Sequence, residues 1–92
     1  MINTVHLTDR AKRDLKRLPF YIIVKLMGWA DDVENRGIEE VRKTPGYHDE
    51  PLKGKRKGER AIRLSKSYRA IYTIKEDSIE FVSIEEVGKH GY

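Results

Sequence analysis

The stretch RAIRLSKSYRAIYTIKEDSIEFVSIEEV, residues 60–87, decides the fold of this 92-residue chain. Apolar and polar residues alternate along it with a period of two, which is the pattern of β-strands with one buried face. Two short polar turns, at residues 65–67 and 76–77, interrupt the alternation. The stretch therefore predicts three antiparallel strands, over residues 61–65, 68–74 and 79–87.

The two-residue turn at residues 76–77 predicts the register of the second and third strands. With such a turn, Tyr72 lies opposite Phe81, and Ile74 lies opposite Ile79, on one face of the sheet. The other face is then expected to carry Arg69, Ile71, Val82 and Ile84.

Residues 8–37, upstream of the strands, carry the period of amphipathic helices. Thr8 is typical of a helix N-cap, and Pro19 separates two helical segments. The apolar stripe of the first segment is Ala11, Leu15 and Leu18. The second segment, which Gly37 is expected to end, has its apolar stripe at Ile22, Leu26, Trp29 and Val33, widened by Phe20, Ile23 and Met27.

A short strand is expected before these helices, over residues 2–7. The element order is then an N-terminal strand, a helical hairpin and an antiparallel three-stranded meander. This order predicts an α+β fold with the helices on one side of the sheet. Because 92 residues suit one small domain, residues 1–92 are expected to form a single domain.

The composition excludes several classes of protein. The absence of Cys excludes disulfides and thiolate metal sites. The longest apolar run has five residues, against the roughly 18 of a membrane span, and the N-terminus lacks a secretory signal pattern. We therefore expect a cytoplasmic protein with no membrane contact. No glycine-rich phosphate loop or zinc motif is present, and the three His lack metal-ligand spacing, so no cofactor and no metal are expected.

Positive charge is concentrated in residues 53–69. This segment has eight cations and one anion, Glu59, and so carries +7, whereas the rest of the chain sums to −3. A basic patch on a mildly acidic body predicts a polyanionic partner, and nucleic acid fits that description. The alternative interpretation is a solvated lysine-rich loop. The acidic pairs at residues 31–32 and 85–86 are expected to be solvated positions.

Several residues outside the basic segment are able to transfer protons. His48 lies in an irregular loop and is equally consistent with a structural and a functional role. His90 and Tyr92 follow directly after the last strand, where the alternative is a frayed tail. If that strand is central, the tail emerges beside Arg63 and Arg69. Such residues suit metal-free cleavage of RNA, which needs a proton acceptor for the 2′-OH, an acid for the 5′-oxygen and cations for the phosphorane.

Four short motifs carry a resemblance to a known family: DEPLKG at residues 49–54, IRL at 62–64, YRAIY at 68–72 and HGY at 90–92. With them the chain resembles the RelE/ParE superfamily of bacterial type II toxins, and most of all the YoeB- and YafQ-like mRNA interferases. The resemblance implies the RelE-like microbial RNase fold and a metal-independent endoribonuclease that cuts mRNA in the ribosomal A site. It also implies a cognate antitoxin, and contact with the ribosome through 16S rRNA.

The resemblance extends to individual residues. Glu50 falls where the interferases place an acidic general base. The basic positions that hold the scissile phosphate are matched by Lys53, Arg63 and Arg69. His90 and Tyr92 match the terminal His and Tyr that serve as acid and base or position the nucleotide, although Gly91 separates them here. Glu50 is the candidate base and His90 the candidate acid, and these two roles can be exchanged. The cations expected to attract RNA and the ribosome more loosely are Lys55, Arg56, Lys57, Arg60 and Lys66.

Two other functions are compatible with the same sequence. One is a ParE-like inhibitor of DNA gyrase, which shares the fold and lacks nuclease activity. The other is a non-catalytic RNA-binding domain with the basic hairpin as its footprint, although paired aromatics on adjacent strands, expected of a base-stacking sheet, are missing. For the toxin, we expect an acidic antitoxin segment to mask the basic face or to displace the C-terminal tail.

Overall fold

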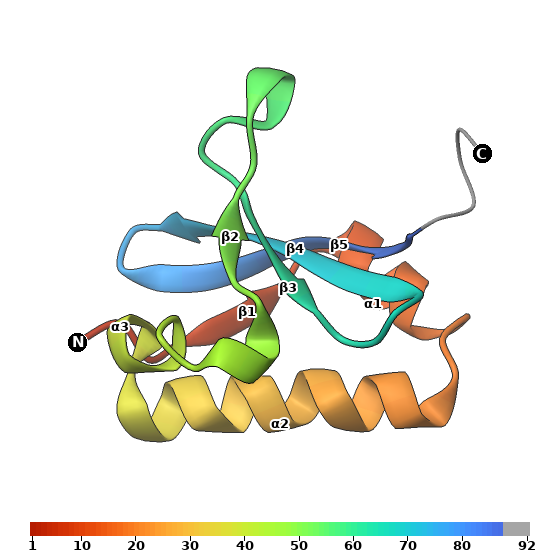
Figure 1. The fold of residues 1–92 in the computed structure, drawn as a ribbon, viewed down its shortest axis with the longest axis horizontal. Helices are drawn as coiled ribbons and strands as arrows, with labels where there is room; N and C mark the ends of the chain where they lie inside the picture. Colours follow the sequence, from red (N-terminus) through yellow and green to blue (C-terminus); the bar gives the residue numbers. More distant parts are fainter. Residues whose placement is uncertain (88–92) are drawn as a thin grey trace.

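A computed structural model describes residues 1–87 of the chain (Figure 1). The helices are α1 (Asp9–Leu15), α2 (Phe20–Arg36) and α3 (Ile38–Val41), with 3₁₀ turns η1 (Pro45–Tyr47) and η2 (Gly54–Arg56). The strands are β1 (Val5–Leu7), β2 (Glu50–Pro51), β3 (Arg60–Arg63), β4 (Tyr68–Lys75) and β5 (Ser78–Glu86). The predicted α+β class is confirmed. No helix in this part of the chain is long and apolar enough to span a membrane.

The strands form one sheet in the order β1-β5-β4-β3-β2. The predicted meander of β3, β4 and β5 is antiparallel, and β1 adds to β5 in parallel. β5 is therefore a central strand. β2, which the alternation did not predict, pairs with β3 at the other edge. The segment between β2 and β3 projects away from the sheet on the side opposite α2 (Figure 1).

A β-bulge in β5 changes the predicted distribution of residues between the faces. Tyr72 pairs with Phe81, as predicted, but the preceding residue, Ile71, pairs with Ser83, so Val82 is the extra residue. A bulge moves every later side chain of its strand to the opposite face. The prediction that Ile84 shares a face with Ile71 is therefore wrong, because Ile84 lies in the helix-covered core.

The core lies between α2 and the sheet. All four residues of the main predicted stripe of α2 are buried: Ile22, Leu26, Trp29 and Val33. The Trp29 ring packs against Tyr72 and Phe81, with centroid distances of 5.2 Å to each. Phe20 and Met27, expected to widen this stripe, are 77% and 60% exposed instead, so the buried face of α2 is narrower than predicted.

Two side chains of α1 and its N-cap hold β5 in place at the bulge. The Thr8 hydroxyl accepts from the Ala11 amide at 3.1 Å, as an N-cap does, and donates to the Val82 carbonyl at 2.9 Å. The Asp14 carboxylate accepts from the Ile84 amide at 3.0 Å. These bonds satisfy backbone groups of β5 beyond the reach of β1, and they fix the direction of the side chains that follow the bulge.

Candidate functional site

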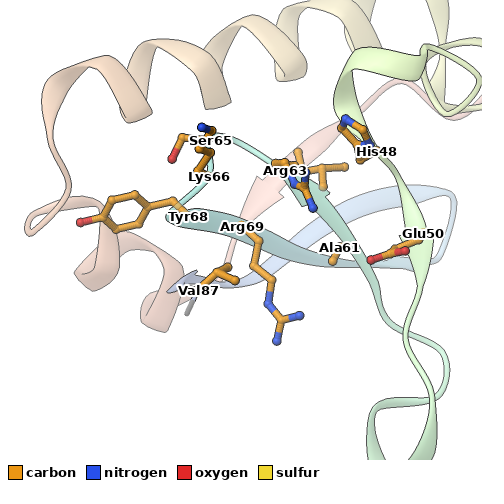
Figure 2. A pocket seen from close by; sticks show the side chains of 10 residues that line it. His48, Glu50, Ala61, Arg63, Ser65, Lys66, Tyr68, Arg69 and Val87 are labelled. Carbon is orange, nitrogen blue, oxygen red and sulfur yellow. The ribbon is translucent and has the colours of Figure 1, made fainter. Parts of the chain in front are cut away.

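A hollow of about 140 Å³ lies at the ends of β3 and β4, beside the loop that leads into β2. Its polar lining comes from three directions: the loop and β2, the strands β3 and β4, and the turn between them (Figure 2). The polar and charged residues with titratable groups that line it are His48, Glu50, Arg63, Lys66, Tyr68 and Arg69. The hollow thus combines cations with groups that can move a proton.

Arg63 and Arg69 lie directly opposite each other on β3 and β4. Five residues separate them, and this pairing places both side chains on one face of the sheet. Arg63 is exposed, and it makes no ion pair within residues 1–87. Two guanidinium groups on adjacent strands are a suitable binding site for a phosphate.

Glu85 is the carboxylate partner of Arg69, with 3.1 Å between Arg69 Nη2 and Glu85 Oε1. Arg56 binds the same carboxylate through both Nη1 (3.1 Å) and Nη2 (2.9 Å), and the Ser83 hydroxyl donates to it at 2.9 Å. Burial raises the pKa of Glu85, but the hydrogen bonds from Arg56, Ser83 and Arg69 outweigh it and hold the pKa at about 2. The expectation that residues 85–86 are solvated is wrong for Glu85, because the bulge turns it toward these arginines.

Arg56 is committed to carboxylates, since its Nε also donates to Glu59 at 2.9 Å. The lysines around it are exposed, and within the described part of the chain they make no ion pair. These are Lys53, Lys55 and Lys57, which we call the basic loop. Arg56 therefore fastens the basic loop to β5, while the lysines stay available to solvent.

Asp49 is an anchor that sequence reasoning missed. Its side chain is 0% exposed and accepts from Arg60 Nε at 2.6 Å. Its second oxygen accepts from the Tyr72 hydroxyl, also at 2.6 Å. Burial, and then the bond to Asp49, raises the pKa of Tyr72 above its ordinary value. The available signal was Tyr72 itself, because a tyrosine in the core needs a partner for its hydroxyl.

The structure brings together part of the predicted catalytic set. Glu50, Arg63 and Arg69 line one hollow, joined by Lys66 from the predicted RNA-binding set. Lys53 is exposed in the basic loop and does not line the hollow. His90 and Tyr92 lie outside the described residues. Within residues 1–87, no cluster of three or more His, Asp or Glu could hold a metal ion.

Two titratable lining residues, His48 and Tyr68, were in neither the predicted catalytic set nor the predicted RNA-binding set. His48 precedes Asp49 in the loop, and Tyr68 begins β4. Tyr68 belongs to the motif YRAIY, in which the family resemblance implies a role for Arg69 and none for Tyr68. The sequence places His48 in an irregular loop, where no periodic pattern indicates which way its ring points.

Comparison with known proteins gives the family of the chain. A family model described as the ParE toxin of the type II toxin–antitoxin system parDE matches residues 5–91. No curated protein matches the chain.

Solved structures show the same fold at low sequence identity. YafQ from E. coli strain BL21(DE3) is 17% identical, with a TM-score of 0.75 over 92% of this chain and 93% of that chain. A chain of the archaeal RelE–RelB complex from Pyrococcus horikoshii is 20% identical, with a TM-score of 0.72 over 97% and 99%. A chain of the YoeB–YefM complex from Staphylococcus aureus is 16% identical, with a TM-score of 0.71 over 97% of each chain.

Proposed function

The chain belongs to the ParE toxin family of type II toxin–antitoxin systems, and on that premise we propose that it is a metal-independent endoribonuclease. Its substrate is mRNA, cleaved in the ribosomal A site, and its effect is to inhibit translation in the cytoplasm. The observation that carries the proposal is the shared hollow of Glu50, Arg63 and Arg69. A protein that only binds another protein has no need of a carboxylate and two arginines that line one hollow.

The reaction proposed for this site is an internal transfer of the phosphate. Glu50 takes the proton of the 2′-OH, and the 2′-oxygen attacks the phosphorus. The bond from phosphorus to the 5′-oxygen breaks, and an acid gives that oxygen a proton. The products are a 2′,3′-cyclic phosphate and a 5′-OH end. Arg63 and Arg69 stabilise the charge of the phosphorane, because donors placed in advance are most effective where charge develops.

The basic loop and Lys66 supply the attraction to RNA in this proposal. Their ammonium groups are exposed and bind phosphates without reading sequence. Arg56 and Arg60 contribute through their carboxylate partners, which hold the basic loop and the residues around Asp49 in place. On the ribosome, the RNA that the basic loop contacts in this proposal is 16S rRNA, as the family resemblance implies.

A cognate antitoxin is the second partner that we propose. Two of the similar structures are toxin–antitoxin complexes by their names, RelE–RelB and YoeB–YefM. This chain offers an apolar groove of about 350 Å³ between β1, α1 and α2, lined among others by Val5, Leu7, Leu15, Ile23 and Met27. The exposed side chains of neighbouring α1 are mostly cationic, including Lys12 and Arg13. An acidic segment with apolar anchors fits such a surface.

Inducing the protein in cells and mapping the 5′ ends of mRNA fragments tests the enzymatic function. We expect cuts phased with codons in translated regions. With purified protein and programmed ribosomes, dialysis of the protein against a chelator before the assay should leave cleavage unchanged. Intact mRNA would contradict the proposal.

The alternative is a poison of DNA gyrase, and the ParE name of the matching family favours it as the second candidate. It predicts double-stranded DNA breaks and inhibition of supercoiling by the purified protein, with mRNA intact. A supercoiling assay run beside the mRNA mapping separates the two functions.

A further inference from the structure

Three consecutive residues where the loop enters β2, namely His48, Asp49 and Glu50, have different surroundings. The side chain of Asp49 is fully buried, whereas its two neighbours, His48 and Glu50, both line the hollow. Figure 2 shows these two side chains coming from one segment, whereas Arg63 and Arg69 come from the strands β3 and β4. The buried residue therefore sits between the two that face the substrate site.

The position of His48 is fixed on both sides. On its C-terminal side, Asp49 is held by the 2.6 Å bonds from Arg60 and Tyr72. On its N-terminal side, His48 caps the C-terminus of η1, and its amide donates to the Pro45 carbonyl at 3.1 Å. The Tyr47 hydroxyl donates to Asp32 of α2 at 2.7 Å and so ties η1 to the helix layer.

The backbone of His48 is in the left-handed region, with φ of 49°. Residues other than glycine adopt this conformation uncommonly, with Asn, Asp and His the most frequent among them, and it costs free energy that the surrounding contacts must supply. Asn or Gly would satisfy such a position at lower cost. The residue present there instead carries an imidazole, which lines the hollow.

We propose that His48 is a catalytic residue, the acid that protonates the leaving 5′-oxygen, and that Asp49 is the positioning residue for both His48 and Glu50. This inference rests on the proposed ribonuclease function. Glu50 accepts the proton of the 2′-OH, the phosphorus–5′-oxygen bond breaks, and the imidazolium of His48 gives its proton to that oxygen. Glu50 thus gains one proton and His48 loses one, and the two residues lie on either side of Asp49 in the sequence.

Charged groups from several elements line the hollow together with His48. They are Glu50 of β2, Arg63 of β3, Lys66 of the following turn and Arg69 of β4, and Tyr68 lines the hollow as well. A phosphodiester bound there adds a negative charge among these cations, and an opposite charge nearby favours the protonated form that the acid role needs.

Single-turnover cleavage of a programmed ribosome across pH tests the inference, with wild type, His48→Gln, His90→Gln and His6→Gln compared. An acid must be protonated, so the wild-type rate should fall at high pH. We expect His48→Gln to lower the rate about 10²–10⁴-fold and to remove this alkaline limb. His6, exposed on β1 away from the hollow, is the matched control and should change neither.

Binding separates catalysis from folding and affinity. An mRNA with a 2′-deoxy nucleotide at the cleavage position cannot react, so its binding can be measured alone. The affinity of His48→Gln for ribosomes programmed with this mRNA should lie within about threefold of the affinity of the wild-type protein. Asp49→Asn should lower the rate but keep the alkaline limb, since His48 remains. If Asp49→Asn fails to fold, Tyr72→Phe removes one of the two anchoring bonds and should show the same pattern more weakly.

The outcomes distinguish this inference from the function on which it rests. A wild-type protein that cleaves no RNA overturns both. A wild-type protein that cleaves, with His48→Gln matching its rate and pH profile, overturns the inference alone. Loss of the alkaline limb in His90→Gln and its retention in His48→Gln would assign the acid to the terminal histidine and likewise overturn it.

Discussion

Arg69 and Glu85 face each other in register on β4 and β5, and 3.1 Å separates Arg69 Nη2 from Glu85 Oε1. The same carboxylate binds Arg56, whose guanidinium anchors the basic loop. One acidic side chain thus connects the proposed phosphate site to the proposed RNA-attracting loop. Because Glu85 engages only Nη2 of Arg69, it orients this guanidinium while leaving other N–H groups for a phosphate.

Replacing Glu85 should loosen this connection. We expect Glu85→Gln to lower the free energy of unfolding by about 1–3 kcal/mol, because two arginines lose a charged acceptor. Urea unfolding measures the change, with Glu80→Gln on the same strand as control. A basic loop that stays equally protected from proteolysis in Glu85→Gln would contradict the anchoring role.

The same residue predicts a pH dependence of stability. The pKa of Glu85 is lowered in the folded state from its ordinary value of 4.5 to about 2. Its contribution is therefore present above pH 4.5 and is lost as the pH falls from there toward 2. In Glu85→Gln this part of the pH dependence should disappear, which unfolding curves between pH 2 and 6 will reveal.

Arg69 and Lys57 should affect cleavage in different ways. Arg69→Ala removes a donor to the phosphorane and is expected to lower the single-turnover rate about 10²–10³-fold. Lys57→Ala should leave the rate at saturation unchanged, weaken binding and flatten its salt dependence. Rates and affinities measured across salt concentrations test this division. Equal and small effects of the two substitutions would count against it.

Glu50 is expected to act as the general base. Glu50→Gln keeps the shape of the side chain but cannot accept the proton, so we expect a loss of about 10²–10⁴-fold in rate with RNA binding retained. Glu76→Gln, in the turn between β4 and β5, is a control outside the hollow. An unchanged rate in Glu50→Gln would move the base to another residue.

The apolar groove predicts where the antitoxin binds. Met27 lines it and is 60% exposed, so Met27→Asp should weaken the complex at least tenfold without lowering cleavage. Val24→Asp alters the same helix at an exposed position outside the groove and is the control. If Arg63→Ala weakens the complex and Met27→Asp does not, the antitoxin masks the basic face instead, as the charge pattern of the sequence suggests.

Much of the fold could be predicted because the signals are local. The period of two in residues 60–87 and the helical spacing of Ile22, Leu26, Trp29 and Val33 arise from the geometry of each element alone. The two-residue turn at residues 76–77 set the pairing of Tyr72 with Phe81, since register follows from turn length. Glu50, Arg63 and Arg69 were predicted from motifs that resemble those of the toxin superfamily, and their catalytic roles remain predictions.

The rest was decided by contacts between segments distant in the chain. The bulge at Val82 turns Ile84 into the core and Glu85 toward Arg56 and Arg69, and Thr8 and Asp14 satisfy the backbone there from the other end of the chain. The alternation of residues within β5 does not predict an extra residue, because the Thr8 and Asp14 side chains that stabilise the bulge are some 70 residues away in the sequence.

The site shows the same division. The sequence by itself determined that an acidic residue, a pair of arginines and a lysine-rich loop are present. Only the tertiary structure decided that Asp49 is buried while its neighbours face the hollow. It also decided that Arg56 and Arg60 pair with carboxylates, whereas Arg63 makes no ion pair within residues 1–87. Burial and ion pairing depend on which groups meet in space, and a charged side chain looks the same in the sequence whether its partner is a carboxylate of the protein or a phosphate of its substrate.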